Sequence, residues 1–119
     1  MVQRVDACPP TDLAIAVVTV DEQLTGWHTL TRQARRPEEI ARAYGHLGEA
    51  VVRLARWRIL PYTEPAIARV AQLKALRLNV RLMDLRIAAI ALESGADVVT
   101  RNRRDFGRVP GLSIEDGSV

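Results

Sequence analysis

The sequence predicts an α/β domain in which helices cover a parallel sheet. Two observations carry this prediction: apolar segments of strand length recur at 13–18, 59–62 and 96–100, and segments with helical patterns separate them. Such alternation is typical of parallel sheets, because a helix must carry the chain back before the next parallel strand can begin. With 119 residues, the chain is predicted to form one domain, residues 1–119, with one continuous core.

The first strand is predicted at 13–18, where LAIAVV is an uncharged apolar run consistent with burial on both faces of a sheet. Thr19 and Glu22 then fit the capping-box pattern, in which a threonine and a glutamate three residues later satisfy the first N–H groups of a helix. A helix is therefore expected to begin at Thr19. Residues 1–11 are expected to be irregular or a helical remnant.

The second helix is predicted from Pro37 to about Trp57. Proline suits the first position of a helix, and the acidic residues after it suit the positive end of the helix dipole. Apolar residues follow at spacings of four and three, which is the pattern of an amphipathic helix: Ile40, Tyr44, Leu47, Val51 and Leu54.

A short strand or extended turn is predicted at 59–62. Leu60 precedes a proline, and the residue before a proline rarely adopts helical backbone angles. Thr63, Glu64 and Pro65 then predict the start of a third helix that runs to about Leu76.

A fourth helix is predicted at 84–93. It is apolar almost all round, so it is expected to be buried. Ser94 and Gly95 end it, and the sequence then predicts a buried strand at 96–100 and a weak last strand at 112–114.

Composition excludes several classes of protein. The chain is 48% hydrophobic and 26% charged, which argues against disorder. Its longest apolar runs are far shorter than the roughly 20 residues of a membrane-spanning helix. The N-terminal sequence lacks the apolar region of a secretory signal, so a cytoplasmic location and no membrane partner are expected. The single cysteine, Cys8, is expected to be an ordinary reduced thiol.

The net charge is +3, and sixteen of the seventeen basic residues are arginines. For most of these arginines a solvated helix face is an adequate explanation. Residues 101–108, RNRRDFGR, differ because they concentrate four arginines around one acid. A guanidinium presents a fixed fork of donors that suits phosphate, so this segment is a candidate for phosphate binding.

Three acids follow predicted strands or begin predicted helices, where ligand sites of parallel sheets form. They are Glu22, Asp84 and Asp105. Each also has a structural explanation, since Glu22 fits the capping box, Asp84 fits a helix N-cap, and Asp105 fits a turn. Taken singly, each acid is better explained by its local structural role.

Taken together, the residues resemble a known family. The stretch MDLRIAAIALESGADVVTRNRRDFGRVPGLSIED, at 83–116, resembles the C-terminal half of a PIN domain, the fold of VapC-type toxin ribonucleases. Shared features are a D-x-x-I-A-A helix start, a V-T-R-N-x-x-D-F strand and turn, and a V-P-G-L tail, in this order. VVTVDEQLTGW, at 17–27, resembles the second strand and helix of the family. The resemblance covers about residues 12–116.

The resemblance implies a three-layer α/β/α fold and a metal-dependent endoribonuclease of a toxin–antitoxin system. Glu22, Asp84 and Asp105 would be its catalytic residues and would hold Mg²⁺ or Mn²⁺, hard cations that prefer carboxylate oxygen. The metal would activate water for attack on an RNA phosphodiester bond.

Further residues would contact the RNA phosphates on this interpretation: Thr100, Arg101, Asn102, Arg103 and Arg104, with Arg108 offsetting the negative field of the acids. The resemblance also implies two protein partners. One is a cognate VapB-type antitoxin that blocks the acidic site, and the other is a second copy of the chain in a homodimer.

The sequence departs from the family in one important respect. PIN domains of this type open with a strand that ends in L-D-T-[DN], and no such motif is present. Asp6 and Asp12 lie on the wrong side of the next strand to replace its aspartate. The chain is therefore expected to be N-terminally truncated and to lack the first, central strand. The alternative function is a catalytically inactive protein that binds an antitoxin through the helices at 19–60 or associates with itself.

Overall fold

The computed structural model describes residues 2–5, 13–100 and 102–116. Its centre is a five-stranded sheet with the order β3-β2-β1-β4-β5. The strands are β1 (Val2–Val5), β2 (Leu13–Ala16), β3 (Arg58–Leu60), β4 (Ala96–Thr100) and β5 (Ile114–Asp116). The predicted strands at 59–62, 96–100 and 112–114 are therefore confirmed as β3, β4 and β5, with shifts of up to two residues at their ends.

The middle of the sheet differs from the expectation. Residues 2–5, expected to be irregular or helical, form β1, which pairs antiparallel with β2 on one side and with β4 on the other. The outer pairs, β2 with β3 and β4 with β5, are parallel as predicted. Gln3 lies opposite both Ala14 and Val98, so β1 satisfies backbone groups that β2 and β4 would otherwise leave unpaired.

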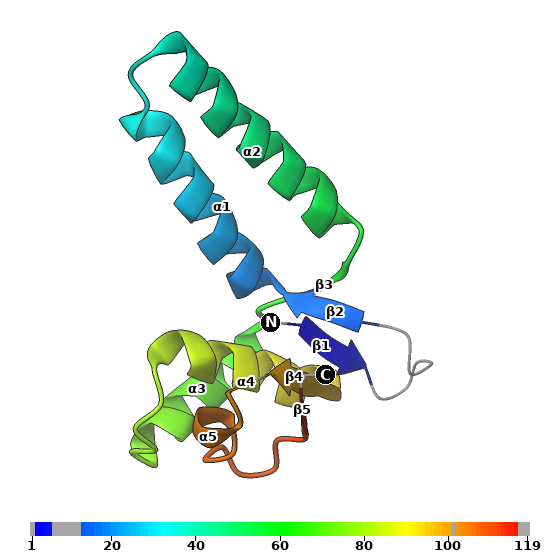
Figure 1. The fold of residues 1–119 in the computed structure, drawn as a ribbon. Helices are drawn as coiled ribbons and strands as arrows, with labels where there is room; N and C mark the ends of the chain where they lie inside the picture. The colour runs from blue at the N-terminus through cyan, green and yellow to red at the C-terminus, as the bar shows by residue number, and fades with distance from the viewer. Residues whose placement is uncertain (1, 6–12, 101, 117–119) are drawn as a thin grey trace.

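Among the described residues, five helices flank the sheet: α1 (Val17–Gln33), α2 (Pro37–Ala55), α3 (Glu64–Ala75), α4 (Leu82–Ser94) and α5 (Arg103–Phe106). In Figure 1 the sheet lies between an α1–α2 hairpin, which projects away from it, and the group formed by α3, α4 and α5. The projecting hairpin makes the molecule elongated, with extents of 49 × 33 × 29 Å. The α/β/α expectation is thus confirmed.

The start of α1 corrects the capping-box prediction. The strand ends at Ala16, which is the N-cap of α1, and Val17 already belongs to the helix. Thr19 lies buried in the first turn instead of capping it, and Glu22 lies exposed in the second turn. The capping-box pattern predicted a start at Thr19, but Val18 and Thr19 are both buried in the first turn of α1. Burial of these side chains outweighs the local capping preference.

Helix α2 begins at Pro37 as predicted, but only part of the predicted stripe is buried: Leu54 is buried and Leu47 is half-buried. Ala43, Ala50 and Leu54 are its buried residues, whereas Tyr44 and Val51 of the predicted stripe are 59% and 49% exposed. The reason is that α2 packs mainly against α1 within the projecting hairpin, and close packing of two helices favours small residues at the contact.

Helices α3 and α4 follow the predictions more closely. The Thr63 hydroxyl accepts a hydrogen bond from the Ala66 N–H at 3.3 Å and so caps α3. Helix α4 is buried on most sides, and Gly95, at φ +65°, ends it in the left-handed conformation that glycine adopts without strain.

The core forms where α4 packs against β4 and the neighbouring strands. The short helix α5 was not predicted, and it contributes the fully buried Phe106 to this core. Within the part of the chain described, no helix has both the length and the apolar character needed to cross a membrane.

Candidate metal and phosphate site

Asp84 is the most deeply buried acid at the site. Its side chain is only 2% exposed, in the first turn of α4, three residues after the N-cap. That cap is Arg81, so the prediction of Asp84 as the N-cap is wrong. The position still suits an acidic side chain, because the first turn of a helix presents unpaired N–H groups and a positive dipole end.

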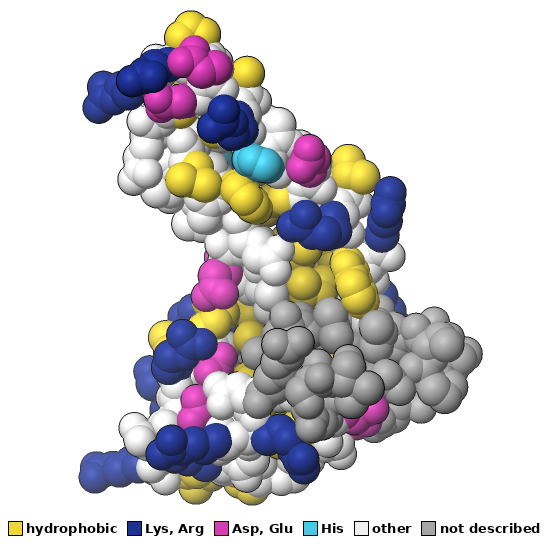
Figure 2. Space-filling view, in the orientation of Figure 1, with side chains coloured by type: hydrophobic (Ala, Val, Ile, Leu, Met, Phe, Trp, Pro, Cys, Tyr) yellow, Lys and Arg dark blue, Asp and Glu magenta, His cyan; other side chains and the backbone are white. Residues whose placement is uncertain are grey.

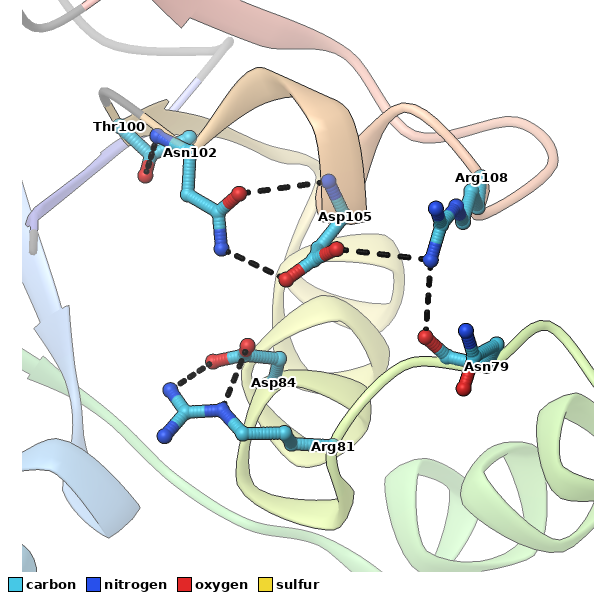
Figure 3. Close-up of polar contacts among 7 residues, drawn as sticks. All are labelled: Asn79, Arg81, Asp84, Thr100, Asn102, Asp105 and Arg108. Carbon is cyan, nitrogen blue, oxygen red and sulfur yellow. Dashed lines mark hydrogen bonds and ion pairs between the residues drawn. The ribbon is translucent and has the colours of Figure 1, made fainter.

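The Asp84 carboxylate faces the Arg81 guanidinium (Figure 3). Arg81 Nε donates to Asp84 Oδ2 at 3.3 Å, and Arg81 Nη2 donates to Asp84 Oδ1 at 3.4 Å. Both carboxylate oxygens are therefore directed at one cation. The two partners differ in solvation, since the Arg81 side chain is 76% exposed.

Arg81 also lies within electrostatic range of the other two predicted acids. The hydrogen bond from Arg81 to Asp84 and the negative charge of Asp84 raise the pKa of the guanidinium, with smaller contributions from Glu22 and Asp105. Partial desolvation acts in the opposite direction. The negative charges of all three predicted acids therefore raise the pKa of the Arg81 guanidinium.

Asp105 is held in α5 by residues from the turn before it. Asn102 Nδ2 donates to Asp105 Oδ2 at 2.9 Å, and the Asp105 N–H donates to Asn102 Oδ1 at 3.4 Å. The Asn102 N–H in turn donates to the Thr100 hydroxyl at 2.9 Å, at the end of β4. This chain of hydrogen bonds fixes Asp105 relative to the strand, and its carboxylate points toward the side of α4 that carries Asp84 (Figure 3).

Arg108 completes the contacts of Asp105. Its Nη1 lies 3.5 Å from Asp105 Oδ1 and donates to the Asn79 carbonyl oxygen at 2.9 Å. Asn79 adopts a left-handed conformation, at φ +59°, in the connection between α3 and α4. Arg108 therefore links the segment after α5 to the segment that precedes Arg81 and Asp84.

Buried packing sets the position of α5. Phe106 is fully buried in the core directly after Asp105. Gly107 follows, and a Cβ atom there would lie 2.7 Å from the Arg103 carbonyl oxygen, to which the Gly107 N–H donates at 2.8 Å. The close approach at Gly107 permits the tight end of this short helix.

The three predicted acids are brought to one region but not into one cluster. Glu22 comes from α1, Asp84 from α4 and Asp105 from α5. Among the residues described, no group of three histidine, cysteine, aspartate or glutamate side chains is gathered closely enough to hold a metal ion. The donors nevertheless fit a hard divalent cation in kind, because they are carboxylates and Asp84 already directs both oxygens at a positive group.

The predicted phosphate contacts fall into two groups. Arg103 and Arg104 are exposed on α5, whereas Thr100 is buried and Asn102 is half-buried with both engaged in the turn. On the face of the molecule in Figure 2, acidic side chains of the lower body lie beside dark blue basic side chains. Arg101, like Cys8, Asp6 and Asp12, lies outside the described residues.

Arg81 is the residue that sequence reasoning missed. Its only local sign is the spacing R-x-x-D, which places an arginine and an aspartate on the same side of a helix start. In a chain with sixteen arginines, that spacing alone does not single out one of them.

Comparisons with known proteins agree with this architecture. The family model described as PIN domain matches residues 11–112. The solved structure of FitAcB from Neisseria gonorrhoeae is similar in fold, with a TM-score of 0.66 and 23% sequence identity, over 94% of this chain and 80% of that chain. A search of curated proteins found no match.

Proposed function

Because the chain belongs to the PIN domain family, we propose that it is a metal-dependent endoribonuclease, the toxin of a toxin–antitoxin system. The observation that carries the proposal is the arrangement of the acids around Arg81. Asp84 and Asp105 come from α4 and α5, Glu22 comes from α1, and all three act on one guanidinium. Asp84 contacts Arg81 directly, while Glu22 and Asp105 add a weaker negative potential at the same place. A concentration of negative potential attracts cations.

Glu22, Asp84 and Asp105 would hold Mg²⁺ or Mn²⁺. A bound divalent ion would activate water and offset the charge that develops on the attacked phosphate. The chain supplies the fixed framework for that ion. Asp84 lies in the first turn of α4, and Asn102 and Arg108 fix the direction of the Asp105 carboxylate.

Arg103 and Arg104 would bind the RNA backbone. Both are exposed on α5. Asn102, just before this helix, and Arg108, just after it, contact Asp105. Guanidinium groups bind phosphate oxygens in a bidentate manner and do so without reading the base sequence. Phosphate contacts by Thr100, Arg101 and Asn102 stay predictions, and the contacts of Thr100 and Asn102 support a first role in positioning Asp105.

The antitoxin would dock on the α1–α2 hairpin. This hairpin projects from the sheet (Figure 1). It exposes the apolar side chains of Tyr44, Val51 and Val52. A surface groove of about 630 Å³ lies along α2 beside Gly45 and Gly48. The same observation supports the second candidate function, a catalytically inactive protein that binds an antitoxin or a second copy of itself.

RNA cleavage distinguishes the two candidates. Purified protein with Mn²⁺ or Mg²⁺ is expected to cut RNA, and Asp84→Asn is expected to abolish the cut while the protein remains folded by circular dichroism. Cleavage that survives this change, or that persists in excess chelator, would contradict the metal-dependent mechanism. A folded wild-type protein that never cuts RNA but binds a VapB-type antitoxin would favour the second candidate.

A further inference from the structure

The acidic region contains a cation supplied by the chain itself. Arg81 contacts both oxygens of Asp84 at 3.3 and 3.4 Å, the oxygens that the proposed metal would need. Each carboxylate oxygen keeps a second lone pair, but a guanidinium and a divalent ion at the same carboxylate repel each other because both are positive. Metal binding at Asp84 is therefore opposed as long as Arg81 stays in contact with it.

The difference in solvation decides which partner moves. Asp84 is 2% exposed and belongs to a buried helix, so its carboxylate has little freedom to move. Arg81 is 76% exposed, so its guanidinium can turn into solvent at little cost. A buried carboxylate left without any cation is unfavourable. Departure of Arg81 is thus favourable only when another cation takes its place.

We infer that Arg81 is an intramolecular competitor of the divalent metal, which occupies Asp84 in the metal-free protein and sets the affinity of the site. The inference rests on the proposed metal-dependent function. It assigns to Arg81 the role of a residue that determines metal affinity, not that of a catalytic residue. Arg81 keeps its positive charge at neutral pH, so it competes as a cation there.

Direct measurement of Mn²⁺ binding tests this inference without reference to activity. Titration calorimetry, or the paramagnetic resonance signal of free Mn²⁺, gives the dissociation constant of each variant. Arg81→Gln removes the competing charge and is expected to tighten Mn²⁺ binding by about fivefold or more. Arg81→Lys keeps the charge and is expected to bind Mn²⁺ close to the wild-type affinity.

Stability supplies a second readout. The metal-free Arg81→Gln protein is expected to unfold at a lower temperature than wild type, because Asp84 loses its cation, and Mn²⁺ is expected to stabilise it by a larger increment. Arg42→Gln is the matched control, since it removes one exposed arginine from the projecting hairpin and should change neither quantity.

The outcomes separate this inference from the proposed function. Mn²⁺ binding and RNA cleavage by wild type, together with unchanged or weaker Mn²⁺ binding by Arg81→Gln, would overturn the inference alone. Failure of both wild type and Arg81→Gln to bind Mn²⁺ would overturn the metal-dependent function and the inference with it. Equal gains in Arg81→Gln and Arg42→Gln would show a general effect of net charge and would also overturn the inference.

Discussion

Asn102 and Asp105 hydrogen-bond to each other in both directions. The Asn102 amide donates to the Asp105 carboxylate, and the Asp105 backbone N–H donates to the Asn102 side-chain oxygen (Figure 3). One side chain therefore caps α5 and also orients the acid of the proposed metal site. Asn102 therefore links the stability of α5 to the proposed activity, and substitutions can separate the two effects.

Asn102→Ala is expected to lower the free energy of unfolding by about 1 kcal/mol, because α5 loses its N-cap. It is also expected to reduce RNA cleavage, because Asp105 loses a donor that fixes its direction. Asn102→Ser is the matched variant, since it retains a capping oxygen but lacks the amide that donates to Asp105. Urea unfolding should show near-normal stability for this variant, and the cleavage assay should show a loss. Wild-type cleavage by both variants would contradict the positioning role.

Phe106→Ala is expected to lower the free energy of unfolding by about 3–5 kcal/mol, because it removes a large side chain from a fully buried place and leaves a cavity. Thermal or urea unfolding measures the loss. Leu76→Ala is the control, since Leu76 is 54% exposed and should change stability by less than about 0.5 kcal/mol. Similar effects of the two substitutions would mean that α5 is not anchored through Phe106.

Two glycine substitutions are expected to act in opposite directions. Gly95→Ala places a Cβ atom on a residue at φ +65° and should destabilise the protein by about 1 kcal/mol. Gly45→Ala lies within α2, where a Cβ would meet no atom within 4 Å, and should stabilise it by about 0.5–1 kcal/mol. Urea unfolding of the two variants checks the pair. A stabilising Gly95→Ala would contradict the left-handed end of α4.

Removal of the two exposed arginines of α5 tests their proposed contact with RNA. Arg103→Ala and Arg104→Ala are each expected to weaken binding by a similar factor for RNAs of different sequence. Each is also expected to reduce the salt dependence of binding, because each removes about one phosphate contact. Fluorescence anisotropy in the Asp84→Asn background, at several salt concentrations, measures binding without cleavage. Arg42→Ala, on the projecting hairpin, is the control. An unchanged salt slope for both α5 variants would exclude them from the RNA-binding surface.

Local patterns predicted the parts of the fold that depend on neighbouring residues. Thr63 caps α3 and Gly95 ends α4 as the sequence indicated, because caps and stops act within a few residues of the helix end. The apolar character of α4 likewise predicted its burial. The same reasoning failed at Thr19, where burial of the first turn of α1 outweighed a matching capping pattern.

The remaining features depend on contacts between distant segments. No periodicity indicates that Gln3 of β1 pairs with Ala14 and Val98 in the middle of the sheet. Likewise, the pattern of α2 could not show that Tyr44 stays exposed, because exposure depends on what packs against the helix.

Motifs and local periodicity were enough to identify the family, the order of the main helices and outer strands, and the candidate acids Glu22, Asp84 and Asp105. The arrangement of those acids depends on how distant segments pack. That packing directs Asp84 at Arg81, and it ties Asp105 to Asn102 and Arg108. The physical reason is that charge interactions act through space, so the partner of a buried carboxylate is fixed by the packing that buries it.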